Sequence, residues 1–508
     1  MNDSINKRFI FKLSANLVGL LMGLATQAII PRGLGPKSYG DYSFLIDFFS
    51  KIIAVLDMGT STCFFNKLSQ RPNDSQIVSF YFIIIGLISP IVILIVVMAH
   101  WSGTRAMIWP GQELQYVYLA SIFAIVIWVS GLVNMMADAY GVTVAAEKIR
   151  MLQKFSGLII LFSLYKFNQL HLTQFFLYNY AMLFALVLAF IWIMNEKGYL
   201  SRKTLLLSKE DLKRYSREFQ KYSYPLFWGG LVGNAATVLD RWWLQAFSGS
   251  EEQGYYNFAY LMGAVFVIFA NSMQPLIAKE FAVNFVKKDS EQMAFLFRRY
   301  IPLFYSIAVF FSCFVVFQAQ NIILIMGGEK FIGAKPALII IAFFTIHQVY
   351  GQLSGSLFLA TNQTVLWTKM NIILFVIGIP VTYFFIGPRN SMGLNAGAAG
   401  LALKIVLMQF IGTNIQLYFN ARMLHLNFWK YVGHQFAVVA CFLLLAFFAS
   451  FGIDYLSGLH GRFVINFILA GILYTFLAVS MVLLFPRIVG LTGSDLNLIV
   501  NKIRQSIA

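Results

Sequence analysis

Long apolar stretches separated by short polar segments make up most of the chain. Fourteen of these stretches are close to 20 residues long, the length that an α-helix needs to cross ~30 Å of hydrocarbon. The fifth is the least apolar, because Lys154 and Lys166 lie within it. The pattern predicts an all-α integral membrane protein with about 14 transmembrane helices. The stretches are residues 9–30, 42–65, 77–99, 114–136, 150–167, 172–194, 222–247, 255–278, 300–325, 336–360, 365–386, 396–419, 433–453 and 463–485.

Lys and Arg are unevenly distributed over the segments between these stretches. If the N-terminus faces the cytoplasm, most of the 38 Lys and Arg residues fall in cytoplasmic segments, which is the bias that multi-pass membrane proteins show. The longest such segment, residues 195–221, contains eight of them. We therefore predict cytoplasmic N- and C-termini, with 195–221 as a linker between two six-helix units.

Two short sequence echoes indicate an internal repeat. Residues 40–45 (Gly-Asp-Tyr-Ser-Phe-Leu) align with residues 254–259 (Gly-Tyr-Tyr-Asn-Phe-Ala) at an offset of 214, and residues 145–148 align with residues 360–363 at an offset of 215. Because each copy contains an even number of helices, both copies run in the same direction and are related by an axis along the membrane normal. The fold class predicted is two pseudo-symmetric six-helix lobes plus a C-terminal helix pair.

The repeat and the linker divide the chain into three parts. We predict an N-terminal six-helix lobe over residues 1–210 and a C-terminal six-helix lobe over residues 211–430. Residues 431–508 then contain transmembrane helices 13 and 14 and a cytoplasmic tail.

Glycine pairs with the spacing Gly-x-x-x-Gly occur within three of the stretches. Such pairs let two helices approach closely or let one helix bend. We predict ordinary close packing between neighbouring helices at these positions. The pairs are Gly19 with Gly23, Gly229 with Gly233, and Gly351 with Gly355.

The overall composition supports a membrane protein. Hydrophobic residues make up 59% and charged residues 12% of the 508 residues, and a soluble protein carries about twice that charged fraction. The net charge of +17 follows from membrane topology, because no soluble domain is present that could offer a basic face to nucleic acid. The cysteines lack metal-binding or disulfide spacing, so we interpret them as small buried hydrophobic residues. They are Cys63, Cys313 and Cys441.

Signals of an enzyme or of ATP-driven transport are missing. The loops contain no Gly-rich phosphate-binding motif, and the six histidines are scattered. No predicted outer loop is long enough to form a catalytic domain. We therefore predict no enzymatic activity, no cofactor and no metal.

Three cations inside predicted spans are candidate substrate contacts. At ~1.5 Å per helical residue, Lys51 lies near the membrane midplane, and Arg241 and Lys404 lie about 10 Å below the outer surface. If they converge with Asp240 on one water-filled cleft, that cleft attracts an anion such as phosphate or pyrophosphate. Local alternatives stay open: Lys51 can pair with Asp47 four residues earlier, and the other two cations can snorkel to the membrane interface.

Two carboxylates and several amides add to this candidate site. Asp57, near the inner end of the second span, and Asp138, just beyond the fourth, are candidates for ion coupling, and a structural role at a helix end is the alternative. Amide side chains in the first spans of both units can contact a sugar, and hydrogen bonds between helices explain them equally well. The amides are Asn16, Gln27, Asn234, Asn271 and Gln274.

Three motifs carry a resemblance to a known family. Residues 31–43 (Pro-Arg-Gly-Leu-Gly-Pro-Lys-Ser-Tyr-Gly-Asp-Tyr-Ser) resemble the loop between helices 1 and 2 of polysaccharide-transport flippases in the multidrug/oligosaccharidyl-lipid/polysaccharide exporter superfamily. Residues 56–59 (Leu-Asp-Met-Gly) resemble the Asp-x-Gly of the family at the end of helix 2. Residues 240–241 (Asp-Arg) with residues 254–256 (Gly-Tyr-Tyr) resemble its helix 7 to 8 signature. With the helix plan, the resemblance covers essentially the whole chain.

The resemblance implies a V-shaped pair of lobes that opens alternately to the two sides of the bacterial inner membrane. Its implied substrate is a lipid-linked oligosaccharide on undecaprenyl pyrophosphate, moved outward for O-antigen, lipopolysaccharide or capsule assembly, with ion coupling left open. The implied partners are this substrate, membrane lipids, and polysaccharide-assembly proteins such as a polymerase and a chain-length regulator. Nucleic acid is not among them.

Three other functions stay open. A drug or cation antiporter of the same superfamily would need a cavity dominated by carboxylates and aromatics, whereas the deepest charges here are cations. A lipid II flippase shares the anion chemistry. A membrane-embedded polysaccharide polymerase or ligase would need a large external loop with catalytic polar groups, and none is visible in the sequence.

Overall fold

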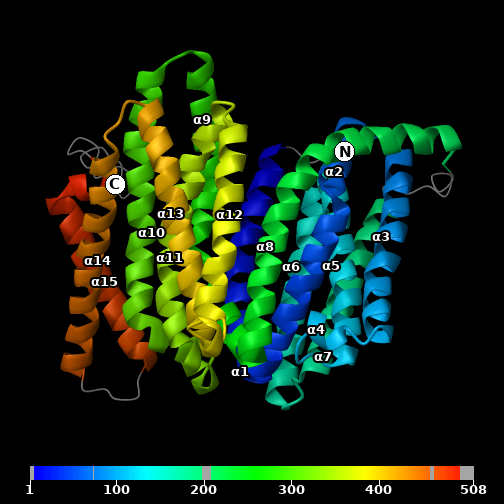
Figure 1. Ribbon diagram of the computed structural model, residues 1–508, viewed down its shortest axis with the longest axis horizontal. Helices are drawn as coiled ribbons and strands as arrows, with labels where there is room; N and C mark the ends of the chain where they lie inside the picture. Colours follow the sequence, from blue (N-terminus) through cyan, green and yellow to red (C-terminus); the bar gives the residue numbers. More distant parts are fainter. Residues whose placement is uncertain (1–4, 73, 197–206, 458–462, 492–508) are drawn as a thin grey trace. The chain divides into compact units, whose positions relative to one another are not determined.

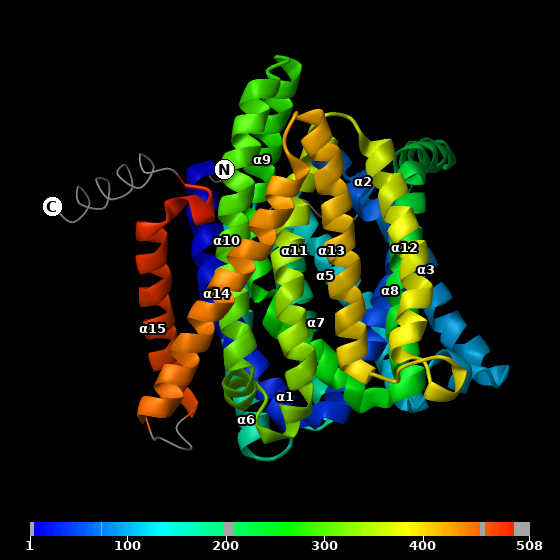
Figure 2. The same ribbon diagram turned by 60° about the vertical axis from the view of Figure 1, so that its left-hand side comes forward.

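The described secondary structure is entirely helical (Figures 1 and 2). The computed structural model describes residues 5–72, 74–196, 207–457 and 463–491, and no strand occurs within them. Each apolar stretch lies on one or more helices over its described residues. The all-α fold predicted from the sequence is confirmed.

The described residues of the N-terminal half form eight helices. The two longest each combine more than one predicted segment, since α1 covers the first apolar stretch and most of the second, and α8 continues from the linker into the next span. The helices are α1 (Ile5–Asp57), α2 (Thr60–Gln70), α3 (Gln76–Trp101), α4 (Arg105–Ile108), α5 (Leu114–Ala139), α6 (Thr143–Lys166), α7 (Leu172–Glu196) and α8 (Lys209–Gly263).

The described part of the C-terminal half continues with seven α-helices and four short 3-10 turns. The α-helices are α9 (Val267–Val286), α10 (Ser290–Met326), α11 (Lys335–Ala360), α12 (Thr364–Ile386), α13 (Gly397–Met423), α14 (Phe428–Ser457) and α15 (Phe463–Leu484). The turns are η2 (Ala264–Phe266), η3 (Glu329–Ala334), η4 (Arg389–Ser391) and η5 (Pro486–Val489).

Many of these helices are suited to a membrane. Nine described helices are long and apolar enough to cross one, and a bent pair within residues 230–286 raises the number to ten. The helix α6 is not among them, in line with the low apolar content of the fifth stretch. The chain is a multi-pass membrane protein.

By its internal contacts the chain divides into unit 1 (Met1–Gly254) and unit 2 (Tyr255–Ala508). The division falls within α8, because this helix continues across the linker end and the following span. The lobes expected at 1–210 and 211–430, with a separate part at 431–508, stay a prediction.

Aromatic side chains dominate the core of unit 1. Phe49 of α1 packs against Trp109 with ring centroids 5.7 Å apart. In a second cluster, Phe64 of α2 stacks on Tyr81 of α3 at 4.5 Å, and Phe219 of α8 is buried with them. The first turns of α8 therefore belong to the core of unit 1.

The last two helices are part of the core of unit 2. Tyr474 of α15 stacks on Phe310 of α10 with centroids 4.8 Å apart, and its hydroxyl donates to the carbonyl oxygen of Phe310 at 2.8 Å. Phe442 of α14 and Tyr305 of α10 are buried in the same cluster. The helix pair α14 and α15 thus packs against α10.

Repeat-related glycines break α1 and α8 at corresponding positions. Gly35 has φ 74° and ψ 170°, and Gly249 has φ 84° and ψ −175°. A positive φ of this kind is readily adopted by glycine alone. The two positions lie 214 residues apart, the offset of the echo at 40–45 and 254–259, so the backbone repeats what the sequence repeats.

The second apolar stretch, residues 42–65, is not one continuous helix as the pattern predicted. Met58 (φ 51°) and Gly59 (φ 80°) are left-handed, so α1 ends at Asp57 and α2 begins at Thr60. The hydrophobic pattern does not predict this break, because the residues before and after it are both largely apolar.

Candidate functional site

The segments that follow the two glycine breaks pack backbone to backbone. A Cβ atom at Gly40 would lie 1.7 Å from the carbonyl oxygen of Ser250, and a Cβ atom at Gly254 would lie 2.1 Å from that of Pro36. Gly40 corresponds to Gly254 in the internal repeat, and Pro36 corresponds to Ser250, both at the offset of 214 residues. The two contacts are therefore equivalent under the repeat. The contact is therefore pseudo-symmetric, like that between two identical surfaces, and it requires glycine at both positions.

Arg241 lies in a polar network beside this contact. It is 8% exposed, as is Asp240. Its Nη2 atom donates to Oγ of Ser43 at 3.1 Å, and Ser43 donates to the carbonyl oxygen of Gly40 at 3.0 Å. The side-chain amide of Gln253 donates to the carbonyl oxygen of Arg241. The guanidinium is bound within the protein and does not extend to an exposed surface as snorkelling requires.

Glutamine side chains join this network to the segment before α5. Nε2 of Gln112 donates to Asp41 at 2.6 Å and to Oγ of Ser250 at 3.3 Å. Nε2 of Gln245 donates to the same Ser250 hydroxyl and to the carbonyl oxygen of Pro110, both at 3.0 Å. Sequence reasoning missed both glutamines, because their partners come from distant segments.

Lys51 is half-buried on α1. Asp47, four residues earlier, is also half-buried, but these two described side chains form no salt bridge with each other. Local neutralisation of Lys51 by Asp47 is therefore not realised in this structure.

Lys404 is buried on α13, 8% exposed, and lies over Gly378 of the neighbouring helix α12. A Cβ atom at Gly378 would lie 3.4 Å from Nζ of Lys404. The glycine thus leaves the space that the ammonium group occupies. Because Arg241 belongs to unit 1 and Lys404 to unit 2, the convergence of the cations on one cleft stays a prediction.

Two predicted polar residues of α9 are brought together by a residue of α11. Nε2 of Gln352 donates to Oδ1 of Asn271 at 2.6 Å and to Oε1 of Gln274 at 2.7 Å. Asn271 is exposed and Gln274 is half-buried. Gln27 and Asn234 are half-buried on α1 and α8, and the side chain of Asn16 lies outside the described part of the structure. A role for these amides in sugar binding stays a prediction.

The glycine pair of α11 packs against polar side chains of α13. A Cβ atom at Gly351 would lie 2.8 Å from Oγ1 of Thr413 and 3.2 Å from Nε2 of Gln409, and one at Gly355 would lie 3.5 Å from Oε1 of Gln416. The pair permits close approach of two helices, as its spacing predicts. The spacing of the α13 residues, i, i+4 and i+7, is a helical face that sequence reasoning could have found.

Both candidate coupling carboxylates lie at helix ends. Asp57 is 6% exposed and accepts hydrogen bonds from the hydroxyls of Thr60 at 2.8 Å, Ser61 at 2.7 Å and Tyr81 at 2.7 Å. Asp138 accepts from Thr143 at 2.9 Å. These contacts link each carboxylate to the first residues of the following helix, and ion coupling stays a prediction for both.

No group of three or more His, Cys, Asp or Glu side chains among the described residues is placed to hold a metal. Cys63 and Cys313 are buried and Cys441 is half-buried, all as free thiols.

Comparison with known proteins assigns the family. A family model described as polysaccharide biosynthesis protein matches residues 5–279, more than half of the chain. The chain belongs to the polysaccharide biosynthesis protein family. The match includes the segments around Gly35 and Gly249 as well as Lys51 and Arg241. No curated protein matches the chain.

Solved structures show the fold of this family member. A lipid II flippase MurJ in an inward closed conformation matches with a TM-score of 0.68 at 14% identity, covering 93% of this chain and 99% of that one. Inward- and outward-facing multidrug resistance MATE transporters of the MOP superfamily match with TM-scores of 0.55 and 0.53, at 15% and 14% identity. They cover 80% and 82% of this chain and 94% of theirs. The resemblance predicted from the sequence is confirmed at the level of family and fold.

Proposed function

We propose that this protein is a flippase that moves an oligosaccharide linked to undecaprenyl pyrophosphate outward across the bacterial inner membrane. The substrate is an O-antigen or capsule repeat unit, and the N- and C-termini are cytoplasmic. Membership of the polysaccharide biosynthesis family carries the proposal. The fold shared with transporters in inward- and outward-facing conformations supports transport by alternating access.

Cations inside the spans supply the chemistry for the pyrophosphate. Arg241 and Lys404 are buried and Lys51 is half-buried, and guanidinium and ammonium groups bind phosphate oxygens by charge-assisted hydrogen bonds. Amides such as Asn271 and Gln352 offer both donors and acceptors, which suits sugar hydroxyls. In this proposal the lipid tail stays in the bilayer while the polar part crosses.

A second candidate is lipid II flipping. It is favoured by the similarity to the lipid II flippase over 93% of this chain. Both substrates combine a polyprenyl chain, a pyrophosphate and a sugar, so the buried cations suit either.

Complementation of two bacterial strains separates these functions. One strain lacks its O-antigen or capsule flippase, and the other is depleted of its lipid II flippase. We expect this protein to restore surface polysaccharide in the first and no growth in the second. The reverse result would establish the second candidate, and rescue of neither strain by protein shown to be in the membrane would overturn both.

A further inference from the structure

The first turns of α8 form an amphipathic segment that packs one face into the core of unit 1. Tyr215 and Phe219 are buried, and both rings contact Phe80 of α3, with centroids 5.6 Å and 4.9 Å away. Lys213 and Arg217 on the same turns are exposed. One face of this segment therefore belongs to the core and the other to the surface.

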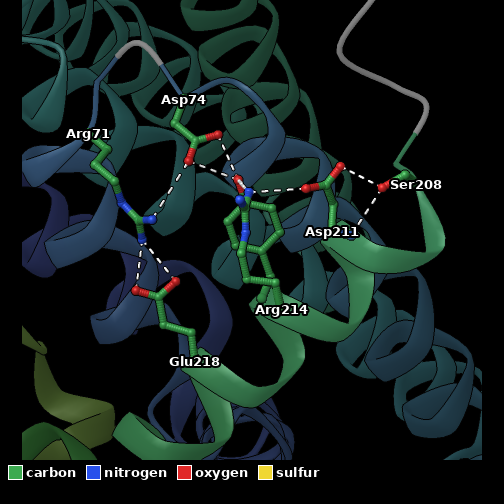
Figure 3. Close-up of polar contacts among 7 residues, drawn as sticks. Arg71, Asp74, Ser208, Asp211, Arg214 and Glu218 are labelled. Carbon is green, nitrogen blue, oxygen red and sulfur yellow. Dashed lines mark hydrogen bonds and ion pairs between the residues drawn. The ribbon is translucent and has the colours of Figure 1, made fainter.

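Polar contacts attach this segment to the turn between α2 and α3 (Figure 3). Glu218 pairs with Arg71 at 2.8 Å and with Lys67 at 2.7 Å, and the hydroxyl of Tyr215 donates to Asp74 at 2.7 Å. Burial and the hydrogen bond to Asp74 raise the pKa of Tyr215 to about 12. The Tyr215 hydroxyl is therefore protonated and available as a donor at neutral pH.

An apolar groove lies between this segment and α3. Its volume is about 600 Å³, within the ~300–1,000 Å³ of typical ligand sites. Apolar side chains of α3 and α8 line it, among them Ile83, Leu87, Leu212 and Phe219. Ile83, Leu87 and Leu212 are exposed. A hydrocarbon chain can therefore enter the groove from the side.

A row of cations borders this groove. Lys213, Arg217 and Lys221 follow one another at i, i+4 and i+8, so they lie on one face of α8. They are exposed and line a depression together with Arg214, Glu210 and Glu218. Each follows directly after a groove-lining residue: Leu212, Ser216 and Gln220. The same helix thus presents a groove-lining row, apolar at Leu212 and polar at Ser216 and Gln220, and beside it a basic row.

Four cations and two carboxylates line the depression: Lys213, Arg214, Arg217 and Lys221 against Glu210 and Glu218. Glu218 forms ion pairs with Lys67 and Arg71. These pairs neutralise its carboxylate, so it does little to offset the positive charge of the basic row. Asp211, outside the depression, pairs with Arg214 at 3.1 Å and accepts from Ser208 at 2.7 Å, as Figure 3 shows. Lys213, Arg217 and Lys221 thus outnumber the exposed Glu210. The basic row is complementary to an anionic headgroup.

We propose that the groove and the basic row bind one anionic membrane phospholipid. An acyl chain occupies the groove along α3, and the phosphate is bound by Lys213, Arg217 and Lys221. From Phe80 to Leu87 the groove spans ~10 Å of helix, which fits within the ~15 Å of hydrocarbon in one leaflet. With the predicted topology this is the cytoplasmic leaflet, which carries the anionic lipids that attract such basic segments.

The test does not depend on transport activity, because lipid binding is measured on purified full-length protein. Native mass spectrometry in neutral detergent follows titration with phosphatidylglycerol or with phosphatidylcholine of the same chain length. We expect the wild type to bind one phosphatidylglycerol tightly and phosphatidylcholine weakly. In the triple variant Lys213→Gln, Arg217→Gln, Lys221→Gln we expect roughly 100-fold weaker binding, since each cation near an anionic lipid contributes about a factor of five.

A second variant tests the groove by filling it. Ser216→Phe places a ring in the groove and leaves the basic row intact, and we expect it to lose the bound phospholipid as well. The matched controls are Lys279→Gln, Lys287→Gln, Arg298→Gln for charge and Thr475→Phe for the added ring, all at exposed positions in unit 2. Both controls should bind as the wild type does, and unfolding temperatures show that all variants are folded.

Three outcomes would overturn the proposal. Unchanged phosphatidylglycerol binding in the folded triple variant or in folded Ser216→Phe would show that the lipid does not bind at this site. Equal competition by inorganic phosphate at the concentration of the lipid would show that the acyl chain contributes nothing. Displacement of phosphatidylglycerol by far lower concentrations of a polyprenyl phosphate would assign the groove to a polyprenyl lipid and not to a phospholipid.

Discussion

Gly40 lies so close to Ser250 that a Cβ atom on the glycine would lie 1.7 Å from the carbonyl oxygen of the serine. The same contact recurs in repeat-related form between Gly254 and Pro36. Each segment follows a glycine with positive φ, Gly35 or Gly249, that breaks its helix. Both segments belong to unit 1.

The first prediction concerns this contact. The added methyl group of Gly40→Ala forces the backbone at residue 40 away from that at Ser250. Overpacking of this kind lowers the free energy of unfolding by about 1–3 kcal/mol, so we expect a lower unfolding temperature in detergent. Gly86→Ala on α3 is the matched control, because a Cβ atom there meets nothing within 4 Å. An unfolding temperature of Gly40→Ala equal to that of the wild type would show that the two segments are not in contact.

The second prediction concerns the buried cations. A hydrogen bond to a charged group contributes about 1.5–3 kcal/mol, so Arg241→Ala and Lys404→Ala should each reduce surface polysaccharide display about tenfold or more in a flippase-deleted strain. Arg389→Ala and Lys330→Ala are matched controls at exposed positions and should keep full display. Full display by the Arg241 and Lys404 variants, with membrane levels verified, would remove these residues from the substrate site.

The third prediction separates two roles of Asp57. Asp57→Ala leaves the Ser61 amide and the Tyr81 hydroxyl without their acceptor, which costs about 1–3 kcal/mol of stability. Asp57→Asn keeps one side-chain oxygen that can accept from the Ser61 amide or the Tyr81 hydroxyl, so it should retain most of this stability.

Transport by the Asp57→Asn protein in reconstituted vesicles then tests coupling. If Asp57 binds the coupling ion, the folded Asn variant loses its response to an imposed proton or sodium gradient. If transport by Asp57→Asn responds to the gradient as the wild type does, Asp57 has only a structural role at the helix end. The same test would then be applied to Asp138.

The fourth prediction concerns the pH dependence of the Glu218 contact. Burial alone would raise the pKa of Glu218, but hydrogen bonds from Lys67 and Arg71 outweigh burial and hold it below the ordinary value of 4.5. A carboxyl with a lowered folded-state pKa contributes stability above its unfolded pKa and loses it as the pH falls through the folded pKa.

The difference in unfolding temperature between the wild type and Glu218→Gln measures this contribution. We expect a constant difference from neutral pH down to the ordinary pKa of 4.5, and a difference that disappears at lower pH. Glu210→Gln is the control on the same segment, since Glu210 is exposed. A difference that changes between pH 6 and pH 8 would show that another group is responsible.

The long apolar stretches predicted the helices well, and the predicted repeat is matched by the backbone at Gly35 and Gly249. The break at Met58 and Gly59 was not predicted, because hydropathy reports burial in lipid and not backbone conformation. The candidate polar residues were found as residue types that are costly in a membrane. Which of them contact one another could not be predicted, as with Gln352, which binds Asn271 and Gln274.

The sequence by itself determined the all-α membrane architecture, the repeat offset and the identity of the buried cations. This is possible because a helix must be long and apolar to cross a bilayer, and because charged residues within such a helix are energetically costly and therefore rare. The tertiary structure decided the partners: Arg241 binds Ser43, 198 residues away, and Glu218 binds Arg71, 147 residues away. Such contacts depend on how helices pack side by side, which no local pattern of residues records.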